Sequence, residues 1–263
     1  MHWVLSNNLK SDSAFPTLLE QLERQGASYT LIGMVPFSGE VVSIDGEQKL
    51  EDLTGPVFGC GKGSMKHAAR RYGWVPGYIE AADYTDCLKH YGEHMLNHDA
   101  IVGKLSEVEP IDDRFFVRPD ADNKSFNGQV MTIDEFMDWQ RTMSAMEDSA
   151  TVTKDDIIIL APLKEIYAEY RFYVVDGKVI TGSLYKSRDT VVYVECIDQT
   201  VIDYAQAMAN LYSPSIAFVL DIADTPDGCK VLETNSISSS GFYAIDVGKF
   251  VAAINELGSA NVN

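Results

Sequence analysis

One predicted hairpin constrains the fold of this chain more than any other stretch. Residues 219–241 have the sequence VLDIADTPDGCKVLETNSISSSG, an apolar run followed by a Pro-Asp-Gly segment, a second run of strand-forming residues and a loop of small residues. Proline presets its backbone angle and glycine accepts a positive one, so a turn is expected. We expect one strand to end at Asp221, the turn to occupy residues 224–228, and the second strand to run from Lys230 to Asn235.

Three oxygen-bearing side chains lie in this hairpin where apolar ones would be expected: Asp221, Glu233 and Asn235. Carboxylates rarely enter a core uncompensated. Glu233 and Asn235 are two residues apart and share a sheet face, and a turn with an odd number of residues would add Asp221 to that face. Hard oxygen ligands suit Mg²⁺. The alternative is a surface hairpin whose polar residues meet water.

Composition limits the class of protein. The chain has 263 residues, 46% of them hydrophobic, so it can form a proper core in one large domain or in two to three small ones. Its formal charge of −18 argues against nonspecific binding of nucleic acid, which requires clustered Lys and Arg. The ordinary consequence of such a charge is solubility.

The cysteines and the apolar runs indicate the compartment. Four cysteines occur without a CxxC pair, which fits reduced thiols better than a disulfide framework or a zinc site. The sequence shows no apolar run of signal-peptide length and no segment long enough for a membrane helix. We therefore expect a cytoplasmic protein that does not associate with membranes.

The N-terminal third alternates short apolar strands with amphipathic helices. A helix is expected from Pro16 to Gly26, because proline favours helix starts and glycine helix ends. A second, basic helix is expected over residues 64–72, and strands are expected near residues 3–5, 29–35, 56–58 and 74–79. This alternation predicts an open α/β layer.

Two features of this region allow two interpretations each. The turn 59–64 is glycine-rich but lacks Walker A spacing; its backbone N–H groups favour a substrate-side loop over a plain tight turn. His90, His94 and His98 recur every fourth residue, which on a helix would give either a zinc-binding stripe or an ordinary polar face. Gly92 weakens that helix.

The middle of the chain has the pattern of a strand, a polar loop and a strand. Strands are expected at residues 115–119 and around 130–131, with a loop at 120–128 that contains Lys124. Thr132 and Glu135 then form a capping-box pattern for a helix over 133–143. The loop is either a lid over phosphates or an ordinary connection.

A second hairpin is predicted around Asp176-Gly177, and a helix over residues 199–211 follows it. Regular pairing would place Arg171 opposite Gly182, Glu169 opposite Leu184 and Tyr167 opposite Lys186. Opposite residues share a face. Glu169, Arg171 and Lys186 would then point the same way, either as part of a site or as a solvated salt-bridge face.

Taken in order, these residues and motifs resemble the C-terminal nucleotide-binding half of ATP-grasp enzymes, over roughly residues 110–250. The resemblance rests on Arg118, the loop 124–128, the segment 159–163, Glu169-x-Arg171, Lys186, Asp221 and the strand 231–235. It is similar to the branch of glutathione-synthetase-like and ribosomal-protein-modifying ligases and to small ATP-grasp proteins of phage genomes. The resemblance implies an α/β (α+β) ATP-grasp fold. Residues 1–100 would form an N-terminal α/β domain, 101–163 a small subdomain with the phosphate lid, and 164–263 a large subdomain with the metal site.

The resemblance also implies ATP and Mg²⁺ as cofactors and a role for each candidate residue. Arg171 and Lys186 would face the transferred phosphate, and Ser236, Ser238, Ser239 and Lys62 would bind the substrate. Arg118, where the family usually has lysine, would bind the phosphates together with Lys124 and Gly128. Ala161 and Leu163 would contact adenine, and Glu169 would contact the ribose. Asp221, Glu233 and Asn235 would bind the metal.

The activity implied is an ATP-dependent carboxylate–amine ligase that forms an acylphosphate and releases ADP and phosphate. A kinase-like phosphotransferase on the same fold and a noncatalytic nucleotide-binding protein are the alternatives. The expected partners are a small-molecule or peptide carboxylate and an amine donor. A nucleic-acid end is also compatible with the basic residues Lys62, Lys66, Arg70 and Arg71, although a solvated helix face is the favoured explanation of this cluster. The sequence does not predict the oligomeric state.

Overall fold

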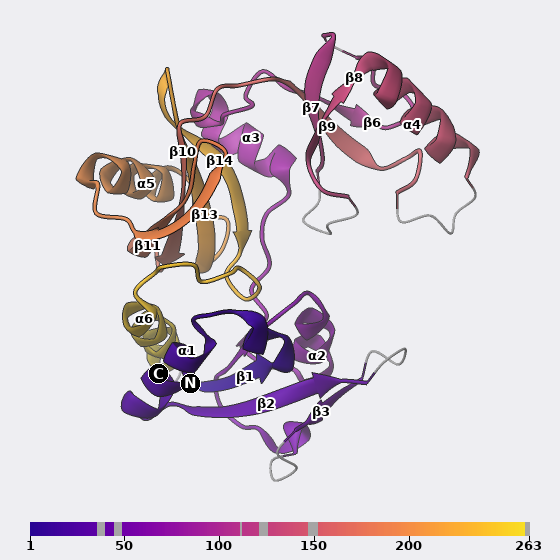
Figure 1. Cartoon of the computed structure of the whole chain (residues 1–263). Helices are drawn as coiled ribbons and strands as arrows, with labels where there is room; N and C mark the ends of the chain where they lie inside the picture. The colour runs from indigo at the N-terminus through magenta and orange to yellow at the C-terminus, as the bar shows by residue number, and fades with distance from the viewer. Residues whose placement is uncertain (36–39, 45–48, 111, 121–125, 147–151, 261–263) are drawn as a thin grey trace. The chain divides into compact units, whose positions relative to one another are not determined.

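The computed structural model describes residues 1–35, 40–44, 49–110, 112–120, 126–146 and 152–260 (Figure 1). The chain forms two compact units, each assembled from segments that are distant in sequence. The first unit contains Met1–Ala81, Ala168–Ile222 and Thr234–Asn263, and the second contains Ala82–Tyr167 and Ala223–Glu233. The division into three domains at residues 100 and 163 stays a prediction.

The first sheet of the first unit has the order β3-β2-β1-β4-β5. Its pairs are parallel except for β2 with β3. The expected α/β alternation is therefore present, with strands β1 (His2–Ser6), β2 (Ser28–Met34), β3 (Val41–Ser43), β4 (Val57–Cys60) and β5 (Pro76–Gly77), helices α1 (Phe15–Arg24) and α2 (Ser64–Tyr72), and 3₁₀ turns at Asn7–Ser11 and Leu50–Asp52.

The ends of these helices follow from their sequence. α1 begins at Phe15 with Pro16 next to it, and buries Phe15, Leu18 and Leu22 along one stripe. α2 ends at Gly73, whose φ of 66° is easily reached without a Cβ atom, and the Gly73 N–H donates back to the last turn.

The second sheet of the first unit has the order β12-β11-β10-β13-β14. Its outer hairpin, β13–β14, continues into the second unit beyond Ile222. The elements are β10 (Ala168–Val175), β11 (Lys178–Ser187), β12 (Thr190–Glu195), β13 (Ala217–Thr225), β14 (Gly228–Ser236), α5 (Gln199–Leu211) and α6 (Val247–Ala260).

One aromatic core joins the parts of the first unit. Trp3 from β1 meets Phe58 from β4 with ring centroids 4.9 Å apart, and Phe250 from α6 at 5.6 Å. Phe250 in turn meets Tyr173 from β10 at 5.1 Å. All four rings are fully buried, and α6 lies beside α1 (Figure 1). This packing holds the N-terminal sheet, α6 and β10 together within the unit.

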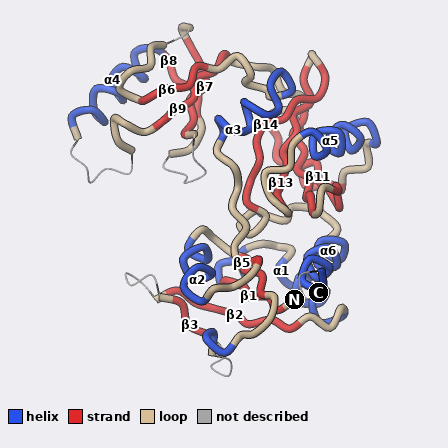
Figure 2. Tube along the Cα trace, turned by 180° about the vertical axis from the view of Figure 1, so that it is seen from behind, coloured by secondary structure: helices blue, strands red, loops and turns tan. Residues whose placement is uncertain are grey.

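The second unit contains an antiparallel sheet of order β6-β9-β7-β8, seen from behind in Figure 2. Thr132 and Glu135 form the predicted capping box of α4, and Phe136 of that helix packs on Phe115 at 5.3 Å. The elements are β6 (Ile101–Lys104), β7 (Arg114–Pro119), β8 (Gln129–Thr132), β9 (Ile157–Pro162), α3 (Tyr84–Tyr91), α4 (Ile133–Ala145) and a 3₁₀ turn at Gly92–His94.

Several local expectations are corrected by the structure. β13 does not end at Asp221 but runs on to Thr225, and the turn holds two residues, Pro226 and Asp227, instead of five. The predicted register of β10 with β11 is also wrong. Glu169 pairs with Lys186 and Arg171 with Ser183, because irregularities after Glu169 and after Tyr173 shift the pairing.

The predicted histidine stripe is wrong as well. α3 ends at Tyr91, and Gly92 has a φ of 54°. His94 then lies in a 3₁₀ turn and His98 beyond it, so the three side chains do not follow one helix face.

No helix among the described residues is long and apolar enough to cross a membrane.

Candidate functional site

A buried ion pair lies at the centre of the second sheet of the first unit, the one with the order β12-β11-β10-β13-β14. Arg171 from β10 donates from Nε to Asp221 Oδ1 at 2.9 Å and from Nη2 to Oδ2 at 2.7 Å. Asn235 from β14 adds a third donor, with its amide nitrogen 3.1 Å from Asp221 Oδ2. Asp221 is completely buried and Arg171 nearly so. The Asn235 amide therefore reaches Asp221, although the turn between their strands holds two residues.

The opposite charges of Arg171 and Asp221 stabilise each other. Burial by itself disfavours the charged guanidinium, but the Asp221 carboxylate outweighs that effect and raises the pKa of Arg171 well above its usual value. A bidentate guanidinium–carboxylate contact fixes both side chains in one plane. The Arg171 guanidinium therefore stays protonated, and the two hydrogen bonds hold both side chains in place.

A second charged contact lies next to it on the β10–β11 ladder. Lys186 Nζ donates to Glu169 Oε1 and the Tyr185 hydroxyl donates to Glu169 Oε2, both at 2.7 Å. Glu169 is 8% exposed, whereas the Lys186 side chain is 39% exposed. Glu169, Arg171 and Lys186 do come together, although not through the register that regular pairing predicted.

Three tyrosines stack on one another next to Arg171, and two of them lie over its guanidinium. Tyr243 lies between Tyr185 and Tyr193, with ring centroids 5.1 Å away on either side and interplanar angles of 23° and 12°. The Arg171 guanidinium carbon lies 5.5 Å from the Tyr185 centroid and 4.8 Å from that of Tyr243, within cation–π range. We call these three residues the tyrosine ladder.

The tyrosine ladder includes an unusual backbone conformation. Tyr243 has a φ of 52°, which costs a bulky residue about 1–3 kcal/mol. Two ring stacks of about 0.5–1.5 kcal/mol each offset that cost. Burial, followed by the nearby charges of Asp221 and Glu169, raises the pKa of Tyr185, so its hydroxyl stays a proton donor. The sequence carried no signal for the tyrosine ladder, because its members come from two strands and a loop.

The serine loop that follows β14 is largely used for structure. The Ser236 hydroxyl donates to the Ile79 carbonyl at 2.6 Å, and the Ser238 hydroxyl accepts from the Ile79 N–H at 3.0 Å. Both serines are buried. Ser239 accepts instead from the Tyr78 hydroxyl at 3.0 Å and is half-buried. Of the three serines predicted to contact the substrate, Ser239 is thus the least buried.

The glycine-rich turn before α2 packs against this serine loop. Gly61 N–H donates to the Ser238 carbonyl at 2.7 Å, and a Cβ atom on Gly61 would lie 2.3 Å from Cβ of Ser6. Lys62 is exposed at the tip of the turn. Close packing therefore explains one of the glycines without any ligand.

Positive charges of the basic cluster on α2 are paired with a nearby carboxylate. Glu80 forms ion pairs with Lys66 and with Arg70, the latter at 2.8 Å. Burial tends to raise the pKa of Glu80, but its bonds to Lys66 and Arg70 prevail and lower it. This pairing favours a solvated helix face over an anion site at this cluster.

In the second unit, Arg118 and Glu233 form an ion pair. Arg118 Nη1 lies 2.8 Å from Glu233 Oε2, and the Arg118 guanidinium carbon lies 4.2 Å from the ring centroid of Tyr84. Their side chains are 18% and 27% exposed. Burial raises the pKa of Tyr84 to about 12, even though the nearby Arg118 charge acts in the opposite direction. The ring is therefore neutral and can stack on the cation.

The remaining nucleotide-binding candidates lie on or near the four-stranded sheet of this unit. Ala161 is buried in β9, and Leu163 is 47% exposed just after it; β6 pairs with β9 only up to Leu160. Gly128 is exposed, and a Cβ atom there would lie 2.5 Å from the Phe116 ring. Lys124 lies outside the described residues.

A cavity of about 290 Å³ adjoins the segment that follows β9. Leu163 and Lys164 border it on one side, and Lys230 borders it on the other. Lys164 also forms an ion pair with Asp99 at 2.5 Å. The cavity is polar and mixed in charge, and it leaves space beside the predicted adenine-binding backbone.

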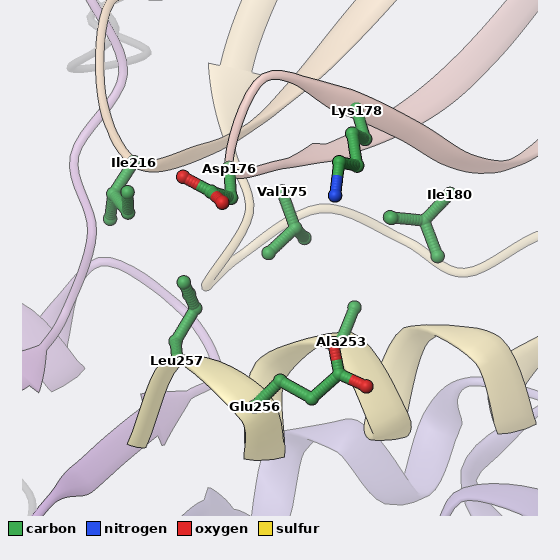
Figure 3. A pocket seen from close by; sticks show the side chains of 8 residues that line it. All are labelled: Val175, Asp176, Lys178, Ile180, Ile216, Ala253, Glu256 and Leu257. Atoms are coloured by element: carbon green, nitrogen blue, oxygen red, sulfur yellow. The ribbon is translucent and has the colours of Figure 1, made fainter. Parts of the chain in front are cut away.

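Another cavity, of about 280 Å³, lies in the first unit between the β10–β11 turn and α6 (Figure 3). Figure 3 shows Val175, Ile180 and Leu257 lining it, with Lys178 and Glu256 among the charged residues around them. None of the predicted site residues lines this cavity.

The donors proposed for Mg²⁺ have suitable chemistry. Asp221, Glu233 and Asn235 offer hard oxygen atoms, and a carboxylate oxygen already bonded to one donor retains a further lone pair. Within the described part of the chain, no group of three or more His, Cys, Asp or Glu side chains is arranged to hold a metal ion.

Comparisons with known proteins fit this architecture. Residues 52–254 match a family model of the ATP-grasp domain, described as family 3 of its clade. A search of curated proteins found no match.

Solved structures share the fold at low sequence identity. D-cycloserine synthetase DcsG is 16% identical, with a TM-score of 0.60 over 98% of this chain and 100% of its own. A RimK domain ATP-grasp protein from Sphaerobacter thermophilus is 10% identical, with a TM-score of 0.62 over 97% and 100% of the chains. D-alanine–D-alanine ligase from Bacillus anthracis complexed with ATP is 13% identical, with a TM-score of 0.58 over 99% and 97%.

The mixed α/β architecture, these shared folds and a family match that covers most of the sequence lead to one assignment. The chain belongs to the ATP-grasp domain family whose model it matches, and so to the ATP-grasp superfamily.

Proposed function

We propose that this protein is a cytoplasmic, ATP-dependent carboxylate–amine ligase that works through an acylphosphate. The observation that carries the proposal is the pair of cations on one sheet face, Arg171 and Lys186, each oriented by a carboxylate. Phosphoryl transfer depends on positioning and on neutralising charge more than on protein acid–base groups. The family membership and the ATP-bound neighbour support nucleotide use.

The proposed reaction has two steps. A carboxylate oxygen of the first substrate attacks the γ-phosphorus of ATP, and the bond from that phosphorus to the bridging oxygen breaks to give ADP. The amine nitrogen then attacks the acyl carbon, the bond to the phosphate oxygen breaks, and the nitrogen loses a proton. Arg171 and Lys186 stabilise negative charge on the transferred phosphoryl oxygens.

The other candidate residues serve binding. Arg118 and Lys124 contact the phosphates, the backbone of Ala161 and Leu163 contacts adenine, and Gly128 lets the lid approach. Glu169 orients Lys186 as well as reaching the ribose. Asp221, Glu233 and Asn235 would hold Mg²⁺, which neutralises phosphate charge when bound. Ser239 and Lys62 contact the substrate, while Ser236 and Ser238 position the loop that carries Ser239.

Trapping with hydroxylamine tests the proposal. The full-length protein is incubated with Mg²⁺, ATP, a panel of carboxylic acids and hydroxylamine in place of the amine, and products are identified by mass spectrometry. A hydroxamate formed together with ADP is the expected result. A stable phosphorylated product without hydroxamate would indicate a phosphotransferase, and the absence of any ATP-dependent product would contradict both activities. Lys186→Met is expected to abolish product, whereas Lys178→Met, outside the site, should not.

A further inference from the structure

The edge strand β12 brings two side chains that the sequence did not suggest onto the face of the candidate site. Arg171 of β10 pairs with Ser183 of β11, and Ser183 pairs with Glu195 of β12. Directly opposite residues on neighbouring strands share a face. Glu195 therefore lies in the same cross-strand row as Arg171, two strands away.

Tyr193 lies on that face too, because it is two residues from Glu195 in the same strand. Its ring forms the outer end of the tyrosine ladder, stacked on Tyr243 at an interplanar angle of 12°. Tyr193 is 56% exposed, whereas Tyr185 and Tyr243 are half-buried. One end of the ladder is therefore a flat aromatic surface open to solvent.

Glu195 completes this surface with a negative charge. It is exposed. The carboxylates deeper in the site have cationic partners, Lys186 for Glu169 and Arg171 for Asp221. A net formal charge of −18 for the whole chain further favours a cationic ligand.

We propose that Tyr193 and Glu195 form the binding subsite for the amine substrate, and that this substrate carries a planar aromatic group. Its ring continues the tyrosine ladder on the open side of Tyr193, and its ammonium group pairs with Glu195. The inference rests on the proposed ligase function, since it assigns the second substrate of that reaction. It specifies the class of amine, an alkylamine that carries an aromatic ring, binds as its ammonium ion and releases one proton to solvent before its nitrogen attacks.

The test compares three probes binding to the full-length protein without ATP, by ligand-observed NMR titration. Tyramine carries both a ring and an ammonium group, n-butylamine carries only the ammonium group, and phenol carries only the ring. Tyramine is expected to bind at least several-fold more tightly than either of the others. Equal affinity for tyramine and n-butylamine, or no binding of tyramine, would overturn the inference.

Substitutions locate the binding. Tyr193→Ala should weaken tyramine binding about 2- to 10-fold, the range expected for one aromatic stack, and leave n-butylamine unaffected. Tyr193→Phe should retain tyramine binding. Glu195→Gln should weaken tyramine and n-butylamine binding alike, by about 2- to 5-fold, as for an exposed ion pair.

Val194→Ala is the matched control. Val194 is 54% exposed between the two residues, but it pairs with Leu184 and projects from the other face. An equal loss of tyramine binding in Val194→Ala would show that the edge strand had been perturbed as a whole, and would overturn the inference. Thermal unfolding of each variant checks that the sheet is intact.

The outcome separates this inference from the proposed ligase function. If tyramine binds as expected but no hydroxamate forms in the trapping assay, the ligase function fails and the subsite stands. If hydroxamate forms but tyramine binding is insensitive to Tyr193 and Glu195, the subsite fails and the ligase function stands.

Discussion

Two ion pairs of similar chemistry have different surroundings in the two units. Arg171 and Asp221 make two hydrogen bonds to each other and are almost inaccessible, with side chains 10% and 0% exposed. Arg118 and Glu233 are joined through one guanidinium nitrogen, and their side chains are 18% and 27% exposed. Both pairs consist of residues predicted to serve phosphate or metal binding, but their environments suit different tasks.

The difference lies in what each arginine would lose by moving. Arg171 would leave Asp221 buried without its main partner, which is costly in a low-dielectric interior. Arg118 would leave a partly exposed Glu233 carboxylate, which is less costly because water reaches that side chain. We infer that the first pair is a fixed part of the site, and that the second can exchange when nucleotide binds.

Breaking the buried pair should have the largest effect. Arg171→Met is expected to destabilise the first unit by about 3–5 kcal/mol, because it leaves the buried Asp221 carboxylate without its cationic partner. The double variant Arg171→Met with Asp221→Leu should recover much of that loss while remaining inactive. Hydrogen exchange of β10 and β13 during urea unfolding measures the effect, and equal destabilisation of the single and double variants would contradict the expectation.

Breaking the exposed pair should affect the ligand more than the fold. Arg118→Ala should cost about 1 kcal/mol of stability or less, as is typical for accessible ion pairs. It should weaken binding of a nonhydrolysable ATP analogue by about 10-fold or more, since a charge-assisted hydrogen bond contributes about 1.5–3 kcal/mol.

Isothermal titration gives that affinity, with Arg118→Lys as the conservative variant. Lysine keeps the positive charge without the planar fork, so it should recover part of the binding. Unchanged affinity in Arg118→Ala would remove Arg118 from the nucleotide site. Arg141→Ala, which removes another exposed guanidinium of the second unit, is the matched control and should bind like the parent.

Salt should produce the smallest effect and should distinguish the pairs directly. A double-mutant cycle on Arg118 and Glu233 should give a coupling of about 0.2–1 kcal/mol at low salt. That coupling should fall towards zero near 1 M salt, where the screening length is about 3 Å. The coupling between Arg171 and Asp221 should change little, because buried charges are poorly screened. Equal salt sensitivity of the two cycles would contradict the comparison.

Local sequence signals located most of the elements. Proline and glycine marked α1, the Thr132 and Glu135 pattern marked the start of α4, and the Asp176-Gly177 dipeptide marked the β10–β11 hairpin. Each of these signals acts within a few residues, so it survives without knowledge of the fold. β12 and α6 were not predicted, although Asp246 offered an N-cap signal for α6, where its carboxylate accepts from the Lys249 N–H at 3.0 Å.

Register was harder to predict than the elements themselves. Two one-residue shifts, after Glu169 and after Tyr173, together moved Lys186 opposite Glu169, where a regular ladder would have placed Leu184. A one-residue slip changes which side chains meet, and nothing in the two strand sequences signals it. The expected grouping of Glu169, Arg171 and Lys186 nevertheless occurs, because both register shifts lie within the short β10–β11 ladder that carries these residues.

The sequence by itself determined that this chain is an α/β protein with two polar hairpins, and it identified Arg171, Lys186, Asp221 and Asn235 as residues of interest. Only the tertiary structure decided how they combine: Asp221 is bound by Arg171, Glu169 is bound by Lys186, and Tyr185 and Tyr243 lie over the Arg171 guanidinium. The physical reason is that strand and turn preferences act over a few residues, whereas a buried charge selects its partner from whatever the folded chain brings within hydrogen-bonding distance.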